Sequence, residues 1–108
     1  MAKTSRRPPS TVVLDLNNPE FLRTFLSLDS ATLHQVAQTL DRIRRMDWDT
    51  VYKAAGLKWE AVDHIPGPHG EKVYSVRLSI KVRALAYREG QFMRFLSLHP
   101  DHDSAYDR

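Results

Sequence analysis

A small set of arginine, histidine and tyrosine side chains near the C-terminus could cleave RNA without a metal ion. RNA cleavage requires that the 2′-hydroxyl lose a proton, that charge on the phosphate be stabilised, and that the leaving 5′-oxygen gain a proton. The planar guanidinium of arginine pairs with phosphate oxygens. Histidine or tyrosine can act as acid or base, a role worth roughly 10² to 10⁴ in rate. The residues that we predict to be catalytic are Arg77, Arg83, His99, His102 and Tyr106.

The catalytic candidates lie in a strongly basic part of the chain. Between Lys72 and Arg94 there are six cations and a single anion, Glu89, whereas the whole chain has a net charge of +3. This balance favours a polyanionic partner, either a nucleic acid or an acidic protein. The cations outside the catalytic set that we expect to bind RNA are Lys72, Lys81, Arg88 and Arg94.

Each of these residues also has a structural explanation. Outward arginines on a strand commonly form a solvated face, and a histidine beside aspartates can be hydrogen-bonded in a turn. Tyr106 could anchor the C-terminus by packing. His99 and His102, three residues apart among aspartates, could bind a metal ion, but nothing completes the ligand set. We therefore expect no metal and no small-molecule cofactor.

Other residues capable of chemistry are assigned to the scaffold. His64 and His69 lie in a segment rich in proline and glycine and are not expected to be catalytic. Trp48 and Trp59 are expected in the core rather than as platforms for stacked bases.

Composition excludes several other classes. The chain has 108 residues, which predicts one domain, and no cysteine, which excludes disulfides, thiolate catalysis and cysteine-based zinc sites. No apolar run approaches the ~20 residues that span a bilayer, so no membrane partner is expected. Residues 1–10 are rich in Lys, Arg, Pro and Ser and lack the apolar segment of a secretory signal. We expect a flexible basic arm at 1–10, a single domain at 11–108 and a cytoplasmic location.

The first half of the chain predicts a strand followed by two helices. Residues 11–16 have the β-branched start of a strand. Asn18 is expected to cap a helix that begins at Pro19. The short connection to the second helix predicts an antiparallel hairpin, and a helical turn is expected at 47–52. The apolar stripe of the second helix is Leu33, Val36, Ala37, Leu40 and Ile43.

The second half alternates with the period of a strand. Residues 57–63 alternate, and 65–70 is expected to be a loop because of its prolines and glycines. A strand is predicted at 73–80. Further strands are expected at 82–87 and 91–98, joined by a turn in which Gly90 suits a positive φ. In the 73–80 strand, Tyr74, Val76, Leu78 and Ile80 are expected to face the core, and Val73, Ser75, Arg77 and Ser79 to face outward.

These elements predict an α+β fold in the order β-α-α-β-β-β. The helix hairpin would pack on one face of a small, largely antiparallel sheet and leave the other face as an open, basic groove. On that face Arg77 points outward, Arg83 begins the neighbouring strand and His99 follows the last strand. We therefore expect these three side chains on one rim of the sheet, with the tail residues beside them.

The order of motifs resembles the C-terminal half of RelE-type toxins of the RelE/ParE superfamily, which typically read "YsvRl…yRaiy…dg…l.i..H…aY". The order of elements over residues 11–106 is similar to the RelE-like fold, and 48–60 is similar to a subgroup of cytotoxic translational repressors. Ser75 departs from the pattern because RelE has a lysine there, and the C-terminal helix of many relatives is not expected after Tyr106. The segments that carry the resemblance are 73–79 (VYSVRLS), 82–87 (VRALAY), 89–90 (EG), 95–99 (FLSLH) and 103–106 (DSAY).

The resemblance implies the toxin of a bacterial type II toxin–antitoxin system, a ribosome-dependent endoribonuclease (mRNA interferase) that cleaves mRNA and represses translation. In this family Arg77 would act on the scissile phosphate and Arg83 would stabilise the transition state. Tyr106 would stack on a base or assist proton transfer, and His99 or His102 would be the general acid. The implied partners are mRNA on the ribosome and a cognate antitoxin, whose acidic or amphipathic segment would cover the arginines or the helix hairpin.

Two alternatives stay open on the sequence. A ParE-like gyrase inhibitor shares the fold but does not need the side chains of His99, His102 or Tyr106. A degenerate toxin kept as a non-catalytic binding module is compatible with the modest net charge.

Overall fold

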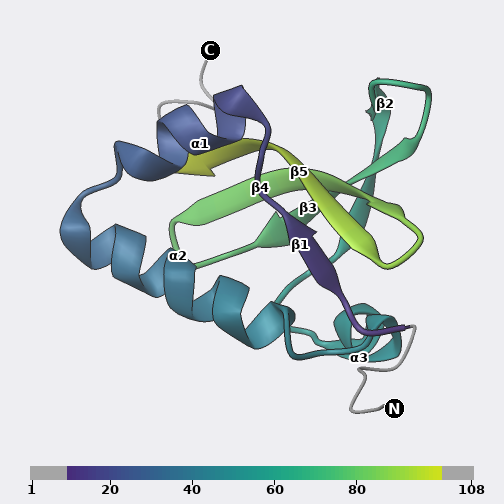
Figure 1. Cartoon of the computed structure of the whole chain (residues 1–108), viewed down its shortest axis with the longest axis horizontal. Helices are drawn as coiled ribbons and strands as arrows, with labels where there is room; N and C mark the ends of the chain where they lie inside the picture. Colours follow the sequence, from purple (N-terminus) through teal and green to yellow (C-terminus); the bar gives the residue numbers. More distant parts are fainter. Residues whose placement is uncertain (1–9, 101–108) are drawn as a thin grey trace, which may run out of the picture.

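The computed structural model describes residues 10–100, and Figure 1 shows helices α1 and α2 lying along one side of a twisted sheet. The hairpin that contains β2 projects beyond the rest of the sheet (Figure 1). No helix in the described part of the chain is long and apolar enough to cross a membrane. The elements are β1 (Val13–Asp15), α1 (Pro19–Leu26), α2 (Ser30–Ile43), α3 (Trp48–Lys53), β2 (Glu60–Pro66), β3 (Lys72–Arg77), β4 (Val82–Glu89) and β5 (Phe92–Pro100).

The sheet has five strands in the order β1-β5-β4-β3-β2. Strand β1 pairs in parallel with β5, and every other pairing is antiparallel. The predicted α+β fold, with a helix hairpin against a largely antiparallel sheet, is therefore confirmed. The predicted order β-α-α-β-β-β is incomplete, because α3 and four strands follow the helix hairpin in the described residues. Strand β2 begins at Glu60, whereas the sequence predicted alternation from residue 57. The helical turn expected at 47–52 is α3.

In the described residues, each of the three helices is preceded by a short polar residue whose side chain caps the first turn. Asn18 Oδ1 accepts the backbone N–H of Glu20 at 2.8 Å, and Pro19 opens α1 as predicted. Asp29 and Asp47 cap α2 and α3 by accepting backbone N–H groups at 2.8 Å. These backbone hydrogen bonds also hold the pKa of both carboxyls below its usual value. Local sequence thus fixes the helix starts.

The core lies between the helix layer and one face of the sheet. The Phe21 ring of α1 lies 5.1 Å, between centroids, from Phe95 of β5 and 5.8 Å from Phe25. On α2 the predicted stripe is correct at Val36, Leu40 and Ile43, which are buried.

One position of the α2 stripe was predicted wrongly. Ala37 is exposed, and Thr39 is buried in its place. The Thr39 hydroxyl donates to the backbone carbonyl of Gln35 at 3.2 Å. That local bond satisfies the hydroxyl, so a polar side chain can turn toward the core without leaving an unpaired group.

The end of β3 differs from the predicted strand at 73–80. The strand stops at Arg77, and Ile80, which was expected in the core, is 86% exposed. The reason is the reversal into β4, where the Leu78 N–H donates to the Val82 carbonyl at 2.9 Å. Val73, which was expected to face outward, is fully buried. It borders a cavity that Val62 of the projecting hairpin also lines.

Two segments predicted as loop or tail belong to strands. Pro66 ends β2 rather than lying in a loop, which is possible because β2 is an edge strand and a missing N–H there breaks no ladder. His99 lies within β5 rather than after it. The turn from β4 to β5 starts two residues later than expected, at Gly90, whose φ of 63° is positive as predicted.

Replacing Phe21 by alanine should destabilise the fold strongly, because its ring joins α1 to β5 and is fully buried. We expect a loss of about 3–5 kcal/mol in the free energy of unfolding, measured by urea denaturation. Leu26→Ala on the same helix is the control, since Leu26 is 70% exposed, and it should change stability by less than about 0.5 kcal/mol. Equal effects of the two substitutions would contradict this packing.

Candidate functional site

Three of the five predicted catalytic residues lie in one row across the sheet. Arg77 of β3 is paired with Arg83 of β4, and Arg83 is paired with His99 of β5. Residues directly paired in antiparallel strands carry their side chains on the same face. Since neighbouring strands lie about 4.8 Å apart, the row spans roughly 10 Å between the outer Cα atoms. We call Arg77, Arg83 and His99 the cationic row.

An irregularity in β5 places His99 on the same face as the arginines. Leu85 is paired with Ser97 but Ala86 with Phe95, so Leu96 is an extra residue in β5. A bulge of this kind exchanges the two faces of the strand beyond it. Phe95 can therefore face the core, while Ser97 and His99, at the same parity, face away from it. Without the extra residue His99 would point into the core.

Two arginines directly opposite one another repel, because like charges across a strand pair are unfavourable. Both Arg77 and Arg83 are only partly buried. Within residues 10–100 the Arg77 side chain makes no hydrogen bond or ion pair. An anion between the two guanidiniums would relieve the repulsion and could accept hydrogen bonds from both. The backbone pairing thus creates a site suited to a phosphate.

His99 is held in place by its neighbour on the strand. Ser97 Oγ lies 2.9 Å from His99 Nε2, and Ser97 is buried. This contact fixes the orientation of the imidazole ring. Sequence reasoning missed Ser97, although its position two residues before His99 in a predicted strand is a signal that could have found it.

A pocket of about 270 Å³ lies beside the cationic row, between β2 and the central strands. The charged or titratable side chains that line it are those of Arg83, His99 and, from β2, His64. The lining residues are Val62, His64, Ile65, Ser75, Arg83, Leu85 and His99. His64 was not expected to take part in chemistry, because the sequence placed it in a segment rich in proline and glycine.

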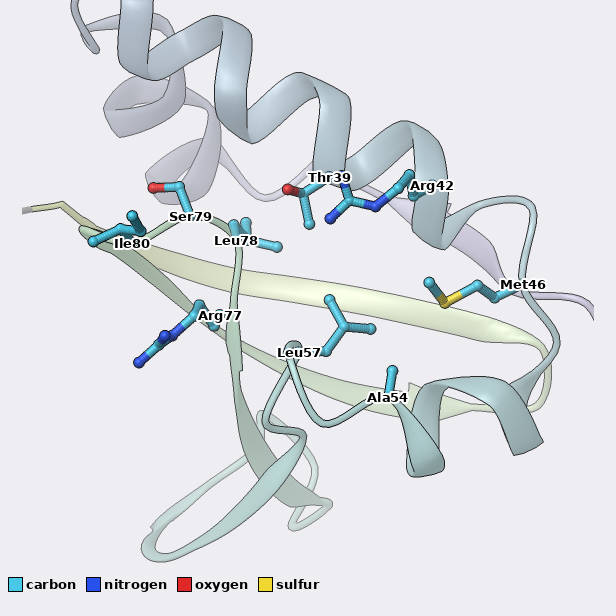
Figure 2. A pocket seen from close by; sticks show the side chains of 10 residues that line it. Thr39, Arg42, Met46, Ala54, Leu57, Arg77, Leu78, Ser79 and Ile80 are labelled. Atoms are coloured by element: carbon cyan, nitrogen blue, oxygen red, sulfur yellow. The ribbon is translucent and has the colours of Figure 1, made fainter.

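A second pocket, of about 340 Å³, lies between α2 and the β3–β4 turn. Figure 2 shows that Leu57 and Leu78 face this space, whereas the Arg77 guanidinium is directed away from both leucines. Arg77 and Arg42 both line this pocket, and Arg77 is also paired with Arg83 across the neighbouring strands.

Two of the cations expected to bind RNA lie in exposed hairpins. Lys81 lies in the turn that joins the strand of Arg77 to the strand of Arg83, so it is close to the cationic row. Lys72 begins β3, and its Nζ lies 3.4 Å from Asp63 Oδ1 of β2. Both lysines are exposed.

Arg88 lies at the far end of β4 from the cationic row. It is five residues from Arg83, roughly 17 Å along the strand. Its Nη1 donates to Tyr52 Oη at 2.7 Å, and its guanidinium carbon lies 4.6 Å from the Trp48 ring centroid. Arg88 thus packs the β4–β5 turn against α3.

Arg94 joins three segments of the chain. It donates to Asp15 Oδ2 of β1 and to Glu89 Oε1 of β4, both at 2.6 Å. Burial raises the pKa of Asp15, but hydrogen bonds from Asn17 and Arg94, with the Arg94 charge, outweigh it and leave the pKa below its usual value. Arg94 and Asp15 therefore form a structural ion pair.

The remaining predicted residues, His102 and Tyr106, lie outside the described residues, as do residues 1–9 of the basic arm. Among residues 10–100 no three side chains of His, Asp or Glu gather in a way that could hold a metal ion.

Comparison with known proteins supports the fold. No protein-family model matches the chain, and no curated protein matches its sequence. Among solved structures, the chain is similar to one in the crystal structure of the archaeal RelE-RelB complex from Pyrococcus horikoshii OT3, with a TM-score of 0.57 and 16% sequence identity. The likeness covers 86% of this chain and 98% of that chain. The predicted RelE-like fold is therefore confirmed.

The Asp15–Arg94 pair predicts a pH dependence of stability. The pKa of Asp15 is lowered in the folded protein, so the ionised carboxylate stabilises the fold. This contribution to the free energy of unfolding should be complete above the unfolded-state pKa of about 3.9 and should be lost as the pH falls through the folded-state pKa. Asp15→Asn should therefore destabilise the protein at about pH 7 but much less at about pH 2, measured by urea denaturation. Asp63→Asn, at an exposed ion pair, should have little effect at either pH. A constant deficit of Asp15→Asn across that range would contradict the ion pair.

Proposed function

We propose that the protein is the toxin of a type II toxin–antitoxin system and acts as a ribosome-dependent endoribonuclease that cleaves mRNA and represses translation. The observation that carries this proposal is the cationic row, in which strand pairing aligns two arginines and a histidine on the face away from the helices. The RelE-like fold supports the same function. The reaction needs no metal ion in this scheme, because arginine and imidazole groups supply the charge and the protons.

The cationic row matches the charge changes of RNA cleavage. Arg77 and Arg83 hold the non-bridging oxygens of the scissile phosphate, where negative charge grows in the transition state. The 2′-oxygen attacks phosphorus, the bond to the 5′-oxygen breaks, and a 2′,3′-cyclic phosphate forms. His99, oriented by Ser97, donates the proton that the leaving 5′-oxygen requires.

The tail residues and the surrounding lysines complete the proposal. Tyr106 is proposed to stack on a base or to assist proton transfer, and His102 is the alternative general acid. Lys72 and Lys81 are proposed to contact flanking phosphates from their exposed positions. Arg88 and Arg94, the other two expected RNA-binding cations, are proposed to contact RNA in addition to their contacts with Tyr52 and Asp15.

The proposed partners are mRNA on the ribosome in the cytoplasm and a cognate antitoxin. The similar chain comes from a complex that contains RelB. An acidic or amphipathic antitoxin segment over Arg77 and Arg83 would neutralise the two opposed guanidiniums and cover the catalytic face.

Replacing either arginine of the cationic row by alanine should abolish toxicity. We expect Arg83→Ala and Arg77→Ala each to lower mRNA cleavage roughly 10²-fold or more, since each removes a group that stabilises the transition state. The measurement is primer extension of cellular mRNA after induced expression, with growth followed in parallel. Arg23→Ala, which removes an exposed cation of α1, is the matched control and should remain toxic.

Intact mRNA during growth arrest by the wild-type protein would rule out the nuclease. A DNA-damage response in its place, unaffected by His99→Ala, would identify a gyrase inhibitor. Absence of any arrest would favour a non-catalytic binding module.

Antitoxin binding should depend on salt through the same arginines. For the protein encoded beside this gene, the double variant Arg77→Ala/Arg83→Ala should bind with a shallower dependence of affinity on ionic strength, because two charge contacts are lost. Titration calorimetry at several salt concentrations measures this slope, and Arg23→Ala should leave it unchanged. If affinity depended on ionic strength equally in the double variant and the wild type, the antitoxin would bind a surface other than the two arginines.

A further inference from the structure

We propose that His64 is a further catalytic residue, which accepts the proton of the attacking 2′-hydroxyl in a pocket that holds the nucleotide bearing that hydroxyl. The inference rests on the proposed nuclease function and extends it by assigning the general base and a nucleotide subsite. The pocket is the one that lies between β2 and the central strands, lined by both His64 and His99.

The pocket brings two imidazoles to one guanidinium. His64 reaches it from β2, Arg83 from β4 and His99 from β5. Cleavage by attack of the 2′-oxygen needs one group to take a proton and a second group to give one, on opposite sides of the phosphate. With the phosphate at Arg83, His99 lies on the β5 side and His64 on the β2 side. The arrangement thus supplies an acid and a base around a single anion site.

His64 and His99 together account for both proton transfers of the cleavage reaction. Neutral His64 takes the proton from the 2′-hydroxyl as the new bond to phosphorus forms. Protonated His99 gives its proton to the 5′-oxygen as the old bond breaks. The products are a 2′,3′-cyclic phosphate and a free 5′-hydroxyl, and no oxidant, reductant or metal is required.

The rest of the pocket suits a ribose and base. Its other lining side chains are mostly apolar, with Val62 and Ile65 on β2 and Leu85 on β4. A flat base can lie against such a surface, while the ribose stays near the imidazoles. The volume of about 270 Å³ accommodates one nucleoside. The subsite therefore fits the nucleotide on the 5′ side of the cleaved bond.

The surroundings of His64 distinguish it from the other histidine of the same hairpin. The titratable and charged groups that line its pocket are Arg83 and His99. Next to it on β2, Asp63 is paired with Lys72 of β3. His69 lies in the hairpin turn, where its Nδ1 is 3.4 Å from Glu71 Oε2 and its side chain is 83% exposed. His69 does not line the pocket and is the matched control.

Binding of nucleoside 3′-monophosphates tests the subsite without requiring cleavage. The four 3′-monophosphates are titrated into the full-length protein, and the histidine ring signals are followed by NMR, with assignments from single His→Gln variants. We expect the His64 and His99 signals to shift together with one Kd for at least one nucleotide, the His69 signal to stay in place, and Arg83→Ala to weaken binding at least tenfold. A shift of His99 alone, or no saturable shift, would overturn the subsite.

Cleavage kinetics test the role of His64 as base. In a ribosome-dependent cleavage assay, His64→Ala should lower the single-turnover rate roughly 10²- to 10⁴-fold and remove the limb of the pH–rate profile that rises with pH. His69→Ala should leave rate and profile unchanged. Wild-type rate and profile in both His64→Ala and His64→Gln would overturn the role of His64 while leaving the nuclease function intact. A wild-type protein that cleaves no mRNA would overturn the proposed function itself.

Discussion

The candidate site depends on the register of three antiparallel strands, and above all on one extra residue in β5. The pairing of Ala86 with Phe95 and of Leu85 with Ser97 leaves Leu96 unmatched. Phe95 and Leu98 can then both be buried in the core although they are three residues apart. The same extra residue turns His99 toward the face of Arg83, so core packing and the cationic row rest on one bulge.

The cations in the second half of the chain are of two kinds. Arg94 and Arg88 are bound to side chains of β1 and α3, and they tie the sheet to its neighbours. Arg77 and Arg83 lie directly opposite each other on paired strands, where two like charges are unfavourable neighbours. Net charge therefore does not show by itself which cations hold neighbouring elements together.

The projecting hairpin changes what the open face can bind. Because β2 is an edge strand that ends with Pro66, it can leave the plane of the sheet without breaking an inner ladder. Its inner side then encloses a pocket over Ser75 and Leu85. A flat sheet would offer the phosphate site alone, whereas this hairpin adds walls that could hold a sugar and base.

The Asn18 cap, most of the α2 stripe and the α+β fold follow from the sequence alone, because caps and periodicity are local properties of neighbouring residues. The order of strands in the sheet, with β1 parallel to β5, does not. The sequence also predicted that Arg77, Arg83 and His99 lie on one rim of the sheet. The exposure of Ile80, the bulge at Leu96 that turns His99 toward the face of the arginines, and the position of His64 in a pocket with Arg83 come from the three-dimensional packing. Each of these depends on pairing between residues distant along the chain, which periodicity within one segment does not encode.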